Sequence, residues 1–156
     1  MGTPWARVVG LGQPFAGDDG VGFAVVEHLR AGGLPEGVVA DVVAEPSALV
    51  GELGEVERLV VVDAVVGAGA PGTVVVLELD DLGDEVRPVS THGMSLGQAV
   101  AIARILCAER DAPRVHVVGV AIDVVATERG AVLSAPIRAA IPRAAAAVRR
   151  LFERDS

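Results

Sequence analysis

Near its beginning the chain reads Val8-Val-Gly-Leu-Gly-Gln-Pro-Phe-Ala-Gly-Asp-Asp-Gly-Val-Gly22. Residues 8–11 are short and apolar, and glycines 10 and 12 end the run, as in a buried strand followed by a turn. From Val21 onward, apolar residues recur at intervals of three and four positions, which is the pattern of an amphipathic helix. The stretch therefore predicts a strand, a glycine-rich turn and a helix, with two carboxylates at the start of the helix.

The glycine-rich turn does not match the common nucleotide-binding loops. The dinucleotide fingerprint requires a third glycine where this chain has Phe15. A phosphate loop requires lysine after its last glycine, whereas Gly17 is followed by Asp18 and Asp19, which would repel phosphate. The acidic pair suits a cation or a hydrogen-bond donor. The simplest alternative is that one of the two acids caps the helix, because Asp is favoured at that position.

Length and composition indicate one domain, residues 1–156, with a core of aliphatic side chains. The formal net charge of -8 argues against nucleic acid or an anionic membrane as a partner. No apolar run has the length of a membrane span, and no secretory signal is visible. Cys107 is the only cysteine, which excludes an internal disulfide. We expect a cytoplasmic protein.

Strand and helix patterns alternate along the rest of the chain. We expect further strands at 38–44, 58–64, 73–79 and 115–122, a short helix from 46 to about 56, and longer helices beginning near 96 and 136. Pro142 is expected to kink or restart the last helix. This alternation predicts an α/β fold with a mostly parallel or mixed twisted sheet, covered by helices on both faces.

The candidate site is formed by polar residues at the carboxyl ends of the strands, where open α/β sheets bind ligands. Asp19 follows the first strand, Asp63 ends the central strand and His92 opens a helix. Two carboxylates and an imidazole are suitable ligands for zinc or nickel. Each residue also has a structural explanation, because a strand-end Asp often caps a turn and a His at a helix start can bond to backbone.

Other polar residues are weaker candidates. Asp123 also ends a strand and is a candidate for a supporting role beside the site. His28 and His116 are expected on a helix surface and within a strand, and Cys107 is expected to be a small buried side chain. The serines lack the Gly-x-Ser-x-Gly elbow of a serine hydrolase.

The chain resembles the hydrogenase maturation endopeptidases, which process the large subunit of nickel-iron hydrogenases. The resemblance spans about residues 7–152 and follows four blocks in order. They are the opening stretch 10–22, Leu59-Val-Val-Val-Asp-Ala64 with Pro71-Gly-Thr-Val74, Ser90-Thr-His-Gly93, and the closing segments 118–120, 133–134 and 141–142. Gln13 and Gly93 stand where the family usually or often has Asn and Gln.

The resemblance implies a mixed sheet between helices and a metal-contact site at Asp19, Asp63 and His92, the same three residues as above. It also implies that the nickel belongs to the hydrogenase large-subunit precursor and is not a permanent cofactor. The enzyme would remove a short C-terminal extension from this nickel-loaded precursor. Whether the metal activates water, or Asp19 or Asp63 acts as a general base, stays open.

Two alternatives come from other functional classes. One is a non-catalytic binding or chaperone-like module that recognises a metal-loaded hydrogenase subunit. The other is a small-molecule or nucleotide-binding α/β protein, which Phe15 and the acidic pair disfavour. Cleavage of the precursor separates the endopeptidase from the binding module, and a nucleotide pull-down tests the last alternative.

Overall fold

The computed structural model describes residues 4–13, 17–51, 56–81, 86–88, 95–106, 113–123 and 132–153. The strands are β1 (Ala6–Leu11), β2 (Val38–Val43), β3 (Arg58–Val66), β4 (Val74–Glu78), β5 (Arg87–Pro88) and β6 (Arg114–Ala121). The helices are α1 (Val21–Gly32), α2 (Leu96–Leu106) and α3 (Ala135–Glu153), with short 3-10 turns η1 (Gly17–Gly20), η2 (Pro46–Leu49) and η4 (Leu79–Asp81). Among the described residues, the five longer strands and the three α-helices lie where the sequence patterns predicted them, whereas the two-residue strand β5 was not predicted.

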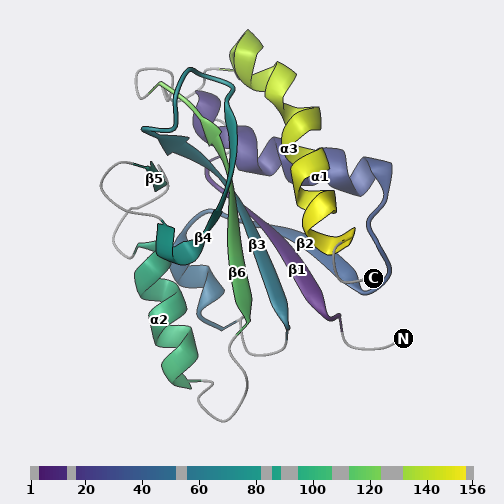
Figure 1. The fold of residues 1–156 in the computed structure, drawn as a ribbon, viewed down its shortest axis with the longest axis vertical. Helices are drawn as coiled ribbons and strands as arrows, with labels where there is room; N and C mark the ends of the chain where they lie inside the picture. The colour runs from purple at the N-terminus through teal and green to yellow at the C-terminus, as the bar shows by residue number, and fades with distance from the viewer. Residues whose placement is uncertain are drawn as a thin grey trace.

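The strands form one mixed sheet, which is mostly parallel (Figure 1). Its order is β2-β1-β3-β6-β4, and the first four of these strands run parallel to one another. β4 is antiparallel to β6, and the short β5 pairs antiparallel with the end of β3. The predicted α/β class with a mixed sheet is confirmed.

Helices cover both faces of the sheet (Figure 1). Successive side chains of a strand point to opposite faces, so Val8 packs with α1 and α3 while Val9 packs with α2 and η2. β3 is buried along almost its whole length, as expected for a central strand covered on both sides. Among the described residues, no helix combines the length and the apolar character needed to cross a membrane.

The structure corrects the sequence predictions for η2, β3 and α3. The helix expected from 46 to about 56 is a 3-10 turn that ends at Leu49. β3 continues to Val66, because β6 pairs with it as far as Val65 and β5 pairs with Val65 and Val66. α3 runs without interruption through Pro142, so the predicted restart of the helix is wrong. Pro142 is exposed, whereas Ile137 and Val148 on either side of it are buried in the core and hold the helix against the sheet.

Candidate functional site

Asp63 lies on the central strand β3, level with the carboxyl-terminal end of its neighbour β1. In the parallel register Gly10 pairs with Val62, and β1 stops one residue later at Leu11. β3 continues beyond this point, so Asp63 lies within the strand and does not end it, which corrects the sequence prediction. The side chain is fully buried, and its Oδ1 accepts a hydrogen bond from the Ala64 N–H at 2.8 Å. The carboxylate is therefore held at a defined place on what we call the rim, the sheet edge where β1 ends beside β3.

Asp19 reaches the same rim from the turn η1. It is buried, and its Oδ2 accepts a hydrogen bond from the Gln13 N–H at 3.3 Å. A Cβ at Gly12 would lie 2.1 Å from the Asp19 carbonyl oxygen and 3.4 Å from its Oδ1. Gly12 also has a φ of +131°, which side chains rarely adopt. The glycine after β1 therefore allows Asp19 to pack directly over the strand end.

The start of α1 brings η1 close to β1 and β3. A Cβ at Gly22 would lie 2.5 Å from the carbonyl oxygens of both Leu11 and Val62, so the helix backbone nearly touches both strands. η1 immediately precedes this helix and itself packs against β3. Asp19 and Asp63, which are 44 positions apart in the sequence, thus lie at one rim of the sheet.

His92 lies outside the described residues, but the chain on both sides of it is described. Four residues before His92, Pro88 pairs with Val65, two residues beyond Asp63. After it, α2 begins at Leu96 behind a reciprocal capping pair, in which the Ser95 N–H donates to Gln98 Oε1 at 2.9 Å and the Gln98 N–H donates to Ser95 Oγ at 3.1 Å. The helix expected to begin near residue 96 is confirmed.

Asp18 has a role that the sequence did not reveal. It is 2% exposed, and its Oδ1 and Oδ2 accept hydrogen bonds of 2.8 Å from the N–H and the hydroxyl of Ser134. The N-cap of α1 is Gly20, without a side-chain cap, so the alternative that Asp18 or Asp19 caps this helix is wrong. The only signal in the sequence was a capping-type serine two residues before Pro136.

The other polar residues considered from the sequence do not add a described metal ligand to the rim. Within the described ranges, no three His, Cys, Asp or Glu side chains are grouped as a metal site, and His92 falls outside these ranges. Asp123 follows β6, on the far side of β3 from β1. Cys107 lies outside the described residues.

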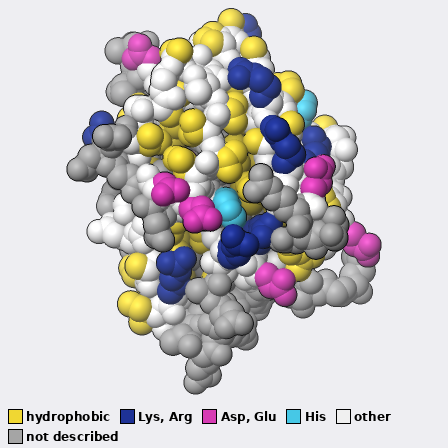
Figure 2. All heavy atoms as spheres, in the orientation of Figure 1, with side chains coloured by type: hydrophobic (Ala, Val, Ile, Leu, Met, Phe, Trp, Pro, Cys, Tyr) yellow, Lys and Arg dark blue, Asp and Glu magenta, His cyan; other side chains and the backbone are white. Residues whose placement is uncertain are grey.

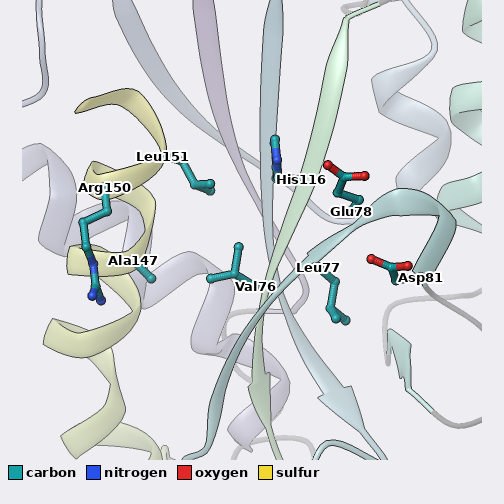
Figure 3. A pocket seen from close by; sticks show the side chains of 8 residues that line it. All are labelled: Val76, Leu77, Glu78, Asp81, His116, Ala147, Arg150 and Leu151. Atoms are coloured by element: carbon teal, nitrogen blue, oxygen red, sulfur yellow. The ribbon is translucent and has the colours of Figure 1, made fainter. Parts of the chain in front are cut away.

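A pocket of about 430 Å³ lies at the other end of the sheet, between β4, the first half of β6 and the second half of α3 (Figure 3). His116 and Glu78, which face each other across β6 and β4, line it together with Arg150. The face viewed in Figure 2 likewise shows a histidine with acidic and basic side chains beside it. This pocket is separate from the rim, because Asp63 pairs with Gly119, three residues further along β6 than His116.

Comparison with known proteins agrees with this architecture. The chain is similar to the [NiFe] hydrogenase maturation protease HybD from Thermococcus kodakarensis, at 22% identity and a TM-score of 0.75, over 94% of this chain and 97% of that one. For the hydrogenase maturating endopeptidase HybD from E. coli, the identity is 23% and the TM-score 0.79, over 97% and 93% of the two chains. For HycI from T. kodakarensis KOD1, the values are 23% and 0.76, over 97% and 94%.

At these identities the solved structures establish the fold. No curated protein matched the sequence. Residues 23–151, well over half of the chain, match the family model described as hydrogenase maturation protease. The chain therefore belongs to the hydrogenase maturation protease family, whose members are hydrolases.

Proposed function

We propose that this protein removes the C-terminal extension of a nickel-iron hydrogenase large-subunit precursor that already contains nickel. The observation that supports this most directly is the placement of two buried carboxylates, Asp19 and Asp63, at one rim of the sheet in a chain of this family. We also propose that His92 joins them. Four residues before His92, Pro88 of β5 pairs with Val65 near the end of β3, two residues beyond Asp63.

Asp19, Asp63 and His92 are proposed to contact the nickel of the substrate. Carboxylate oxygens and imidazole nitrogen are suitable donors for divalent transition metals. Burial of both carboxylates strengthens their attraction for a cation, because charges interact more strongly in a low-dielectric environment than in water. The site would thus recognise only a precursor that carries its metal, and it would place the adjacent peptide bond at the rim.

Hydrolysis of that bond requires a water molecule to lose a proton as it attacks the carbonyl carbon, while the departing amine gains one. Either carboxylate at the rim has the lone pairs to accept the proton of the water. Holding the bond and the water in a fixed geometry would supply a large part of the rate acceleration. We propose that the reaction takes place in the cytoplasm, which is consistent with a chain that has a single cysteine.

The direct test is to mix the protein with a nickel-loaded large-subunit precursor and follow the intact mass of the precursor. We expect loss of a C-terminal fragment with the nickel-loaded precursor and none with the nickel-free one. Asp19→Asn and His92→Ala should abolish cleavage while the protein stays folded. Wild-type cleavage by either variant would refute the site assignment, and binding without cleavage by the wild type would favour a non-catalytic recognition module.

A further inference from the structure

The turn that carries Asp19 is anchored by its neighbour, Asp18. Both carboxylate oxygens of Asp18 accept hydrogen bonds from Ser134, one from the backbone N–H and one from the hydroxyl, each at 2.8 Å. Asp18 is 2% exposed and Ser134 is partly buried, so competition from water for these bonds is reduced. Hydrogen bonds to a charged acceptor are about twice as strong as those between neutral groups. The two residues are 116 positions apart, and the pair joins the N-terminal turn to the C-terminal helix.

Ser134 is itself held in place by the start of α3. Its carbonyl oxygen accepts a hydrogen bond from the Arg138 N–H at 2.9 Å, as the residue before a helix does. The first turn of α3 packs closely on the loop before β4, where a Cβ at Gly72 would lie 2.8 Å from the Pro136 carbonyl oxygen. That loop is bonded to the end of β6 through the Gly72 N–H and the Ala121 carbonyl at 2.8 Å. Asp18 is therefore tied, through Ser134, to a fixed part of the sheet.

The contact from the Gln13 N–H to Asp19 is weaker than this anchor. Its length of 3.3 Å lies beyond the usual range for an N–H···O bond, whereas both bonds to Asp18 are close to ideal. Asp18 and Asp19 are adjacent in a turn of only four residues. The Asp18–Ser134 pair therefore contributes, together with the packing of η1 on β3, to the backbone position from which the Asp19 carboxylate lies over Gly12.

We propose that Asp18 is a positioning residue, whose two hydrogen bonds to Ser134 fix η1 so that the Asp19 carboxylate faces the rim beside Asp63. The catalytic effect of this positioning rests on the proposed function. Its structural part, the coupling between Asp18 and the contact from Gln13 to Asp19, stands on the hydrogen bonds alone.

Substitutions can separate the geometry of Asp18 from its charge. Asn keeps both contacts, because its carbonyl oxygen accepts from the Ser134 N–H and its amide donates to the Ser134 hydroxyl oxygen. Ala removes both contacts. Ser134→Ala removes the hydroxyl contact and keeps the backbone one. Asp41→Ala is a matched control on β2, where Asp41 pairs with Arg7 away from the rim.

The first measurement is cleavage of the nickel-loaded precursor by folded protein. For Asp18→Ala we expect kcat to fall by about 100-fold with little change in KM, because a catalytic group displaced by about 1 Å costs a factor of this size. Asp18→Asn should recover most of the lost kcat, and Asp41→Ala should cleave like the wild type. Wild-type kcat in Asp18→Ala, with the wild type active, would overturn the positioning role and leave the proposed function intact.

The second measurement does not depend on activity. Hydrogen exchange at the Gln13 amide, followed by NMR, should be faster in Asp18→Ala than in the wild type and unchanged in Asp18→Asn. If Asp18→Ala does not fold, Ser134→Ala provides the same comparison with a smaller acceleration. Unchanged Gln13 exchange in a folded variant would overturn the inference even if the precursor is never cleaved.

Discussion

At Gly22 the backbone of α1 lies very close to the strands that form the rim, so Gly22→Ala tests the packing of the site. A Cβ at this position would lie 2.5 Å from the carbonyl oxygens of both Leu11 and Val62, and 3.0 Å from the Leu11 nitrogen. All three are backbone atoms of central strands. They cannot retreat without disturbing the hydrogen bonds between β1 and β3, so the helix must move away instead.

The expected cost follows from two opposing terms. Overpacking of a tight interior costs about 1–3 kcal/mol, and the upper end applies here because two immobile carbonyls are in the way. Ala is a better helix former than Gly by about 0.8–1 kcal/mol, which offsets part of the strain. The net loss is about 2 kcal/mol. At about 2–4 °C per kcal/mol for a chain of this size, the melting temperature should fall by about 4–8 °C.

Gly97→Ala is a matched control. Gly97 is the second residue of α2, as Gly22 is of α1, but the nearest atom to its added Cβ is the Ser95 Oγ at 3.9 Å. This variant gains the helix preference without the strain and should be stabilised by up to about 1 kcal/mol. The difference between the two variants therefore isolates the close approach of α1 to the sheet.

Urea unfolding followed by tryptophan fluorescence can measure both variants. Trp5 is the only tryptophan, and its ring packs edge-on against Phe152 at a centroid distance of 5.7 Å, so its emission reports the docking of α3. If Gly22→Ala is as stable as Gly97→Ala, the steric reasoning is refuted. A Gly22→Ala protein that is destabilised as expected but still folds and cleaves like the wild type would show that the rim tolerates a displaced α1.

Two further predictions concern the metal and the core. Because the nickel is expected to arrive with the precursor, protein purified in the presence of a chelator should hold far less than stoichiometric nickel or zinc, as measured by elemental analysis. Stoichiometric metal after chelation would contradict the proposal that the substrate carries the metal. Arg58→Ala should lower the free energy of unfolding by about 2 kcal/mol in the same urea assay, since the buried guanidinium donates to the Leu151 carbonyl in the last turn of α3. An unchanged midpoint would mean that water replaces this contact.

The elements were predictable because their signals are local. The continuous apolar run of β1, which is buried at all but one position, and the three-and-four spacing in α1 each depend on fewer than about a dozen neighbouring residues. The rim position of Asp19 and Asp63 also followed from a general rule about parallel sheets. The extent of β3 could not be predicted in the same way, because Val65 and Val66 belong to the strand only through their pairing with β5 and β6.

The role of Asp18 shows where sequence reasoning stops. An acidic pair before a helix favours capping, yet the N-cap of α1 is Gly20 and Asp18 bonds to Ser134 instead. Nothing near Asp18 in the sequence indicates a partner 116 positions away. The choice is made by the packing of α1 and α3 side by side on one face of the sheet, which brings η1 to the start of α3.

By itself, the sequence determined the α/β class and the succession of the main strands and helices along the chain. It also determined the motifs of the family and the acids Asp19 and Asp63 as site candidates. Only the tertiary structure decided the strand order, the continuation of β3 past Asp63 and the anchoring of η1 by Ser134. The physical reason is the separation along the chain over which each kind of interaction acts. Periodicity and capping preferences act between near neighbours, whereas strand register and buried hydrogen bonds depend on which distant segments pack together.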